Sequence, residues 1–287
     1  MNLTELEIFK AVAEQGSVTK AAASIHRVPS NVTTRVKQLE SRLGVELFHR
    51  EGRGLALSSQ GKVLLSYAER LLRLSSEAQA AVQANAPQGS LRLGSLESTA
   101  AARLPSILSR YHRAHPDVRL ELVTGTSAAL ANKVRSEELE AAFVAEPFHP
   151  ADVETHPAFE EELVLVSARS VGSIRSPADI GARTILAFTT GCAYRRRLES
   201  WLGRARLVPE RVMEYGSYHA IVACAAAGGG VGVVPRSVVS AIGAEDQVAT
   251  HRLPRHVARA RTLLIWRHGF QSSALDALHV EIRRRRR

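Results

Sequence analysis

Apolar positions repeat at intervals of three and four through the first 44 residues, and turn residues divide them into three segments. In the first segment they fall largely on one helical face before Gly16, a residue suited to ending a helix. Ser17 is a good N-cap for a second helix, and Pro29 prevents that helix from continuing. Ser30 or Asn31 then caps a third helix, which Gly44 ends. Its buried stripe is expected to contain Val32, Val36, Leu39 and Leu43.

A different pattern covers residues 45–58, VELFHREGRGLALS. Two strand-like pieces flank the turn at 52–54, which predicts a small β wing. Ser58 then opens a long helix to about Ala84, in which apolar positions follow a four-three spacing that favours pairing with another helix. The alternative is a helix that lies on its own domain. The pairing stripe would comprise Leu64, Ala68, Leu71, Ser75, Ala78 and Val82, with Leu65 and Leu72 beside it. The segment ANAPQG at 84–89 is the clearest linker.

From Ser90 onward, strand-like and helix-like segments alternate, which is typical of an α/β fold. Strands are predicted at 91–96, 118–125, 141–146, 163–168, 184–188, 231–235 and 262–267. Amphipathic helices are predicted at 99–114, 127–138, 194–206, 218–227 and 272–284. The strand-helix-strand order over 118–146 favours a parallel sheet. The stretches near 163–170 and 261–267 are expected to cross between two lobes.

Length and composition then limit the class of protein. A chain of 287 residues suggests about two domains. It has no apolar run long enough for a membrane span and no signal-peptide pattern, so a cytoplasmic protein is expected. Cys192 and Cys224 stand far apart without a CxxC or Cys/His cluster, so neither a disulfide framework nor a metal site is expected. Both are interpreted as structural thiols.

The formal net charge of +10 suggests a polyanionic partner. Five of the positive charges form the terminal run Arg283–Arg287, and such a run is usually a solvated end. The overall charge is therefore suggestive without being decisive.

The three helices and the wing have the plan of a winged helix-turn-helix, which inserts the second helix of its pair into the DNA major groove. The face opposite the apolar stripe carries hydroxyl and cationic side chains, which suit base edges and phosphates. A small helical bundle with ordinary surface threonines is the alternative. The DNA-binding candidates are Ser30, Thr33, Thr34, Arg35 and Lys37 in the helix, with His49, Arg50 and Arg53 in the wing.

A family resemblance favours DNA binding. The run from Phe9 to Gly61, reading F-AVAE-GS-T-AA, S-VTTR-KQLE-RLGVELFHR and LALSSQG, resembles the N-terminal domain of LysR-type transcriptional regulators. The resemblance covers essentially the whole chain and implies that the third helix is the recognition helix. The chain departs from the usual pattern in two places. Most members of the family have Gln-Pro before the recognition helix, whereas this chain has Pro29-Ser30, with the proline one position earlier. Thr33-Thr34-Arg35 stands in place of the common Ser-Arg-Gln. Operator preference therefore does not transfer from better-known relatives.

The same resemblance implies a C-terminal domain of two α/β lobes, similar to a periplasmic binding protein, with a small effector between them. Ligands also collect at the carboxyl ends of parallel strands on general grounds. Several hydroxyl-bearing loops are expected on that side, although each residue could equally be an ordinary N-cap. The effector-binding candidates are Ser95, Glu97, Ser98, Thr99, Thr126, Ser127, Thr189, Thr190, Tyr194, Ser217, Tyr218 and His219.

Glu97 stands out among these candidates, with Glu146 as a second carboxylate. Carboxylates are unfavourable in a site for anions, so an effector that carries an amine is favoured over one that is purely anionic; exposed acids are the alternative. The segments GSLESTAAARLP, CAYRRRLESW and SYHAIVACAAAGGGVGVVPRS also resemble the effector domain of the putrescine-utilisation subgroup of the family. Both observations favour an amine or a polyamine-pathway compound.

Other function classes are less well supported. The chain has no GxSxG, HExxH or Walker motif, and GGGVG at 228–232 precedes a strand, the reverse of a dinucleotide loop. No enzyme and no cofactor are therefore expected. A solute-binding protein without a regulatory role, an anion-responsive regulator and a redox switch through Cys192 and Cys224 are the alternatives.

The expected organisation has three parts: a DNA-binding domain at 1–58, a linker and dimerisation helix with its hinge at 59–89, and a two-lobed effector domain at 90–287. Lobe I is expected at about 90–162 and 268–287, and lobe II at about 163–267. The expected partners are double-stranded operator DNA with an inverted repeat, a small-molecule effector and further copies in a homodimer or homotetramer, without a membrane.

Overall fold

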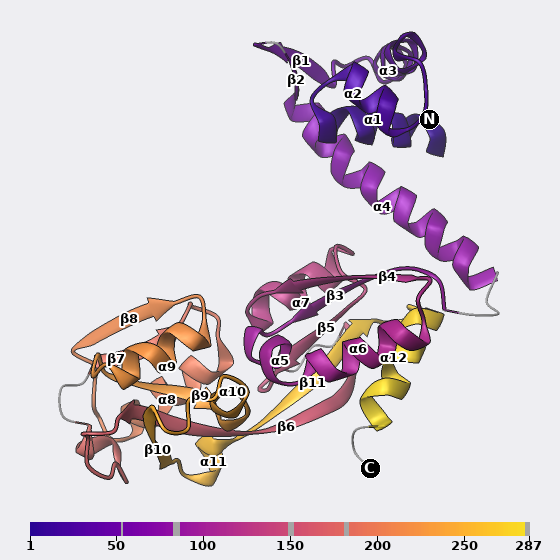
Figure 1. The fold of residues 1–287 in the computed structure, drawn as a ribbon. Coiled ribbons are helices and arrows are strands. Elements are labelled where there is room, and N and C mark those ends of the chain that lie inside the picture. The colour runs from indigo at the N-terminus through magenta and orange to yellow at the C-terminus, as the bar shows by residue number, and fades with distance from the viewer. Residues whose placement is uncertain (53, 83–86, 149–151, 181–183, 285–287) are drawn as a thin grey trace. The chain divides into compact units, whose positions relative to one another are not determined.

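The computed structural model describes residues 1–287 except 53, 83–86, 149–151, 181–183 and 285–287. The chain forms two compact units, residues 1–84 and residues 85–287 (Figure 1). Within the described residues, no helix is long and apolar enough to cross a bilayer.

The N-terminal unit contains four helices and a two-stranded wing, so the predicted winged helix-turn-helix with a long following helix is confirmed. Its elements are α1 (Leu3–Gln15), α2 (Val18–Ser24), α3 (Pro29–Leu43), β1 (Phe48–Glu51), β2 (Gly54–Leu57) and α4 (Ser59–Val82). One apolar core joins them, with Phe9 and Val12 of α1, Ala21 of α2 and Leu39 of α3 almost fully buried.

Local capping explains most of these boundaries. Gly16 and Gly44 both take the left-handed conformation and end α1 and α3, while the Ser17 side chain caps α2. The predicted cap of α3 by Ser30 or Asn31 is wrong. The helix begins at Pro29 with Val28 as N-cap and no side-chain cap, because the first helical position needs no N–H and suits the fixed φ of proline.

Helix α4 has one face packed on the core of the N-terminal unit and another face that is exposed and partly apolar. Ala68 is fully buried, and Leu64, Leu65 and Leu72 pack against the core of the N-terminal unit. The predicted pairing stripe therefore lies in part on its own domain. Large apolar side chains remain exposed on the helix, namely Val63, Tyr67, Leu71, Leu74 and Val82.

The C-terminal unit is built on one continuous sheet with the strand order β4-β3-β5-β11-β6-β9-β7-β8, to which β10 adds by pairing with β6. Its strands are β3 (Gly89–Ser95), β4 (Val118–Thr124), β5 (Ala141–Ala145), β6 (Val153–Ala168), β7 (Thr184–Phe188), β8 (Arg211–Tyr215), β9 (Val231–Pro235), β10 (Val248–Arg252) and β11 (Arg259–Arg267). Strand β3 pairs in parallel with β4 and β5, and β7 pairs in parallel with β8 and β9, as expected for βαβ units.

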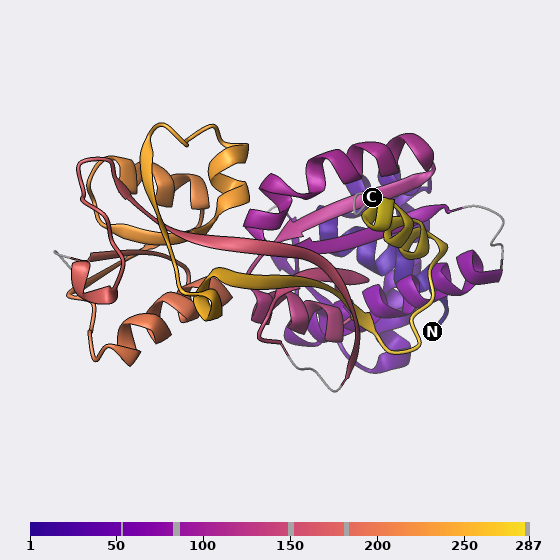
Figure 2. The same cartoon turned by 90° about the horizontal axis from the view of Figure 1, so that it is seen from below.

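The sheet has two halves that share the 16-residue strand β6 (Figure 2). Residues 153–162 of β6 pair with β11 in lobe I, and residues 163–168 pair with β9 and β10 in lobe II. Strand β11 pairs along its length with β5 and the first part of β6, so residues 259–267 belong to lobe I. The expected extension of lobe II to residue 267 is therefore wrong, and the chain returns to lobe I through residues 253–258.

Helices flank both halves of the sheet (Figure 1). They are α5 (Glu97–Ala102), α6 (Leu104–Ala114), α7 (Ser127–Arg135), α8 (Ala193–Arg204), α9 (Tyr218–Ala226), α10 (Arg236–Ala241), α11 (Arg255–Ala258) and α12 (Ser273–Arg284), with a short 3-10 helix at Pro177–Asp179. Helix α12 closes lobe I, where Leu278 and Ile282 are buried beside Leu91 of β3. One apolar cluster continues from lobe I into lobe II. The expected two-lobed α/β architecture is confirmed.

Candidate functional site

The recognition-helix candidates are all exposed to solvent on α3. Val32, Val36 and Leu39 are buried in the core of the N-terminal unit. The opposite side of the helix is exposed and carries Ser30, Thr33, Thr34 and Lys37, and Arg35, also exposed, flanks it. The Thr33 hydroxyl donates to the Pro29 carbonyl oxygen at 3.0 Å within the helix, which leaves its methyl group at the surface.

Two carboxylates fix α3 relative to the rest of the N-terminal unit. The buried Glu5 carboxylate accepts a hydrogen bond from the Arg42 guanidinium at 2.7 Å, and this interaction lowers the pKa of Glu5. Near the end of α3, Glu40 Oε1 accepts from the backbone N–H of Leu47 at 2.8 Å and of Phe48 at 3.3 Å. These contacts hold the helix against α1 and against the start of the wing.

The wing presents cationic side chains to solvent. Strands β1 and β2 pair antiparallel, and His49 and Arg50 on β1 are exposed. Arg53 lies outside the described residues. An exposed helix face of hydroxyl and cationic groups beside an exposed basic wing has the chemistry to contact both base edges and phosphates.

The effector candidates of lobe I cluster at the start of α5 and α7. Ser95, Ser98 and Thr99 are almost fully buried, and Glu97 is half-buried. The Ser95 hydroxyl donates to the Leu96 carbonyl oxygen at 2.9 Å. Ser127 Oγ accepts from the Ala145 backbone N–H at 3.0 Å, so it joins α7 to β5. Ser95 and Ser127 therefore have structural hydrogen bonds.

Lobe II contributes an aromatic wall. Tyr218 at the start of α9 is buried, stacks on Phe188 with ring centroids 4.9 Å apart, and lies 6.2 Å from the ring of Tyr194 at the start of α8. The Cys192 thiol lies 3.2 Å from the Tyr218 hydroxyl. Burial raises the pKa of both tyrosines, so both remain neutral phenols at physiological pH.

The two lobes meet at Glu97. Ser217 Oγ, which caps α9 in lobe II, donates to Glu97 Oε1 of lobe I at 3.4 Å. Thr126 also approaches lobe II, because a methyl group added at Gly191 would lie 3.1 Å from Thr126 Oγ1. Burial raises the pKa of Glu97, while hydrogen bonds from the backbone of Tyr218 and from Ser217 act in the opposite direction.

Several buried oxygens with incomplete hydrogen bonding gather around this junction, where the Tyr194 hydroxyl interacts with the hydroxyls of Ser98 and Thr262. They are Glu97 Oε2, Ser98 Oγ, Thr99 Oγ1, Tyr194 OH and Thr262 Oγ1. Buried polar atoms in proteins are normally fully hydrogen-bonded, so a cluster of incompletely hydrogen-bonded oxygens is typical of a site that a ligand or water completes. We call this set, with Phe188 and Tyr218, the effector cleft.

Other predicted residues lie at the edge of the cleft or outside it. Thr189 is partly exposed, and His219 is exposed. Thr190 is also exposed, and its hydroxyl donates to Glu214 at 3.2 Å. Glu146 accepts from Arg261 at 3.0 Å and lines a different pocket, so the expectation of a second carboxylate beside Glu97 is wrong.

Three residues outside the set of sequence candidates lie close to Tyr194 or are joined to a neighbour of it. Thr262 lies on β11, and Glu161 lies on β6, where the Arg103 guanidinium donates to both of its oxygens at 2.7 and 2.8 Å. Ser237 Oγ of α10 also donates to Glu161, at 2.8 Å. These residues sit on crossing strands and helix ends without a local motif, so no signal in the sequence pattern marks them.

Comparisons with known proteins agree with this architecture. Residues 3–62 match the family described as bacterial regulatory helix-turn-helix protein, lysR family, and residues 84–287 match the LysR substrate binding domain. The chain is 40% identical over 277 residues to the uncharacterized HTH-type transcriptional regulator YusT of Bacillus subtilis, covering 96% of this chain and 93% of that protein. It is 37% identical to GltR of the same organism, covering 93% and 90%. These relatives are transcriptional regulators, and neither is named for putrescine.

Solved structures show the same fold. A full-length OxyR variant from Pseudomonas aeruginosa has a TM-score of 0.72 at 24% identity, covering 99% of this chain and 95% of that one. Full-length CbnR in complex with its target DNA has a TM-score of 0.72 at 23% identity, covering 99% of each chain. With family matches across both units and relatives of similar length, the chain belongs to the LysR family of helix-turn-helix transcriptional regulators.

Proposed function

We propose that this regulator binds an inverted-repeat operator as a homodimer or homotetramer and responds to an amine bound in the effector cleft. The observation that carries the effector class is Glu97, a half-buried carboxylate between the lobes that accepts hydrogen bonds from Ser217 and from the backbone of Tyr218 but has no arginine or lysine partner among the described residues. A cationic amine would provide the missing positive charge. The aromatic wall of Phe188, Tyr194 and Tyr218 suits such a ligand, because ring faces attract cations.

The DNA-binding proposal rests on the exposed side of α3 and on the wing. Ser30, Thr33, Thr34, Arg35 and Lys37 would contact the major groove, while Arg50 and Arg53 would contact phosphates or the minor groove. The exposed apolar residues on α4 support pairing of two copies, since large apolar side chains in a long helix are usually covered by a partner. Pairing would place two winged domains on the two halves of an operator.

The Thr34→Ala variant tests the base-reading role. We expect it to weaken binding to an operator, selected from random DNA by the unmodified protein, by about 1 kcal/mol, or roughly fivefold. Binding to non-operator DNA should change little, because a methyl or hydroxyl contact to a base edge contributes only at the right sequence. Fluorescence anisotropy with both DNAs measures the two affinities.

Two further variants make this test specific. Arg50→Ala should weaken both DNAs alike and flatten the dependence of affinity on salt concentration, as loss of a phosphate contact does. Thr4→Ala, on an exposed position of α1, is the matched threonine control and should leave both affinities unchanged. Equal losses on operator and non-operator DNA for Thr34→Ala would contradict base reading.

The Glu97→Gln variant tests the amine. We expect the full-length protein to bind an amine such as putrescine, detected as a rise in melting temperature, and Glu97→Gln to bind it about tenfold more weakly. Binding should also weaken as the pH falls through the pKa of Glu97, which burial raises, because only the carboxylate attracts the cation. Glu245→Gln, an exposed acid in lobe II, is the matched control.

The same variant separates the amine from the anion-responsive alternative. An anionic effector in the cleft would be repelled by Glu97, so its affinity should rise in Glu97→Gln. A screen of amines, amino acids and organic acids distinguishes the two. If only organic acids bind, and they bind more tightly to Glu97→Gln, the proposal of an amine effector is overturned, while the cleft remains the effector site.

A further inference from the structure

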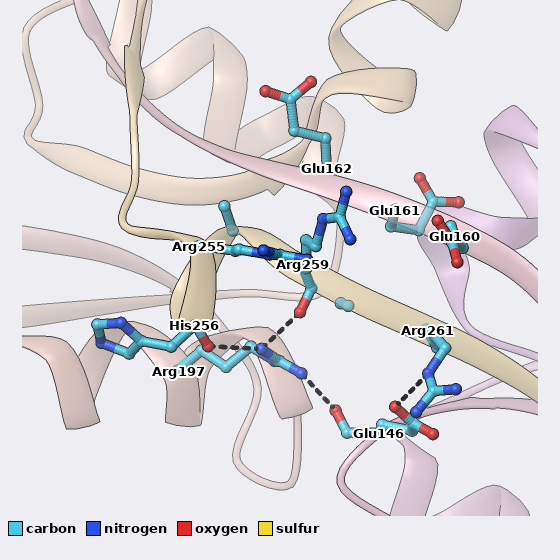
Figure 3. Close-up of a pocket in the computed structure, with 11 residues that line it drawn as sticks. Glu146, Glu160, Glu161, Glu162, Arg197, Arg255, His256, Arg259 and Arg261 are labelled. Carbon is cyan, nitrogen blue, oxygen red and sulfur yellow. Dashed lines mark hydrogen bonds and ion pairs between the residues drawn. The ribbon is translucent and has the colours of Figure 1, made fainter.

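A second pocket lies at the junction of the two lobes, and of the residues assigned to the effector cleft and its surroundings only Glu161 is among those that line it. Its volume is about 1210 Å³, and its walls come from the residue after β5, the middle of β6, α11, the start of β11 and one side chain of α8 (Figure 3). Residues 255–261 include the segment by which the chain returns from lobe II to lobe I. We call this space the hinge pocket.

Most of the acidic groups in the hinge pocket already have a cationic partner. Glu146 is paired with Arg261 at 3.0 Å, Glu161 with Arg103 at 2.7 Å and Glu162 with Arg236 at 2.8 Å. Arg103 and Arg236 do not line the pocket themselves. Among the described residues, Glu160 is the one pocket carboxylate without an ion-pair partner. The acidic charge that a ligand would meet is therefore small.

Three guanidinium groups of the pocket are not neutralised in this way. Arg255 and Arg259 are exposed, and their side chains have no hydrogen-bond or ion-pair partner in the part of the chain that the structure describes. Arg259 lies opposite Glu162 in the register of β11 and β6, but the Glu162 carboxylate binds Arg236 instead. Both side chains are free to bind a ligand at the mouth of the pocket.

Arg197 forms the third positive group, and its hydrogen bonds within the described part of the chain are to backbone oxygens. Its guanidinium reaches from α8 to the carbonyl oxygens of Arg259 at 2.9 Å, His256 at 3.1 Å and Glu146 at 3.4 Å (Figure 3). Its Nε is buried and has no partner among the described residues. Burial lowers the pKa of Arg197, because the charge is partly removed from water, and the charge of the nearby Glu146, which is paired with Arg261, acts in the opposite direction without outweighing burial. A bound anion would compensate that charge.

We propose that the hinge pocket binds a small anion with two or three negative groups, of the class of polycarboxylates and phosphate compounds, separately from the effector cleft. Arg255 and Arg259 would bind two of its negative groups in the planar geometry that guanidinium groups offer, and Arg197 would supply charge from the wall. Three arginines against one free glutamate favour an anion of this valence over a neutral or cationic ligand.

The pocket also has a structural link to the effector cleft. Arg197 lies one helical turn after Tyr194 on α8, and Tyr194 lines the cleft while Arg197 holds the returning segment and the end of β5. Both lobes therefore contribute to the pocket. An anion would bind most tightly when the two lobes are positioned so that these groups lie close together. Its binding would change the affinity of the cleft for the effector by thermodynamic linkage.

Isothermal titration calorimetry on the full-length protein tests the proposal, with citrate and inorganic pyrophosphate as separate probes and potassium chloride at equal ionic strength as the reference. We expect saturable binding of at least one probe, weakened about tenfold in the double variant Arg255→Gln/Arg259→Gln. Because both residues are exposed, the double variant should fold, which circular dichroism checks. Citrate alone would identify a polycarboxylate, and pyrophosphate alone would identify a phosphate compound.

The matched control is Arg204→Gln, an exposed arginine at the end of α8 that does not line the pocket. It should bind the probes as the unmodified protein does. The proposal is overturned if neither probe binds beyond the chloride reference, or if the double variant binds with unchanged affinity.

Discussion

Gly61→Ala is expected to destabilise the N-terminal unit by about 3 kcal/mol and to abolish DNA binding at moderate temperature. Gly61 lies in the first turn of α4, where a methyl group would come within 2.1 Å of the Leu47 carbonyl oxygen and 2.9 Å of Leu57. That carbonyl oxygen also accepts a hydrogen bond from the Ser58 backbone N–H at 2.9 Å. Making room would therefore move the backbone at the base of the wing and break this bond.

The chain offers a matched control and a selective probe for this prediction. Gly203 also lies within a helix, α8, and a methyl group there would meet nothing within 4 Å. Gly203→Ala should therefore stabilise its unit by up to about 1 kcal/mol through helix propensity. The two tryptophans, Trp201 and Trp266, both belong to the C-terminal unit, so fluorescence reports that unit alone.

Thermal melts distinguish the two units. In Gly61→Ala, circular dichroism should show an early transition that tryptophan fluorescence does not follow, together with loss of binding to the operator. The prediction would be contradicted by an unchanged melting curve together with unchanged DNA affinity. That result would mean that the backbone at Gly61 and Leu47 moves apart to admit a methyl group without loss of stability.

The N-terminal unit could be predicted almost completely because its boundaries are local. Each helix has its stop or start within the segment itself, such as Gly16, Ser17 and Gly44. The start of α3 was misplaced because two principles compete at Pro29. Proline ends the preceding helix, and it is also one of the best residues for the first position of the next.

The C-terminal unit was predicted less well where tertiary contacts override local pattern. The first part of β6, VETHPAFEEE, is polar and contains Pro157, which sits where the register between β6 and β11 shifts. Strand β8 is an edge strand and mostly exposed, so it lacks the apolar alternation that marks a strand. Both owe their structure to pairing with a distant strand.

The candidate effector residues show the same division. Loops after strands were correctly recognised as one side of the domain, since Glu97, Ser98, Tyr194 and Tyr218 lie around one junction. Glu146 was misplaced because the end of a strand does not reveal which of two pockets a side chain enters. Ion pairs between residues far apart in the sequence, such as Arg103 and Glu161, leave no periodic pattern in the sequence that could predict them.

Arg103→Met is expected to destabilise the C-terminal unit by about 3 kcal/mol, because it leaves the buried Glu161 carboxylate without its cation. The Glu161 side chain is only 3% exposed, and the Arg103 guanidinium holds both of its oxygens. The carboxylate in turn raises the pKa of Arg103, as expected of a close pair. Ser237 on α10 joins the same carboxylate, so the cluster ties α5 of lobe I to lobe II across β6.

Two comparisons decide whether the buried charge is the cause. Adding Glu161→Gln to Arg103→Met should recover much of the loss, because the neutral amide has no unpaired charge to bury. Arg236→Met removes the partner of Glu162 on the same strand, but that pair is 42% and 54% exposed, so the loss should stay below about 1 kcal/mol. Urea unfolding followed by tryptophan fluorescence measures all three variants. If Arg103→Met proves no more damaging than Arg236→Met, the cluster does not hold the lobes together, and the polar links between them would be the Glu97–Ser217 contact and the hydrogen bonds of Arg197 to the backbone of Glu146 and Arg259.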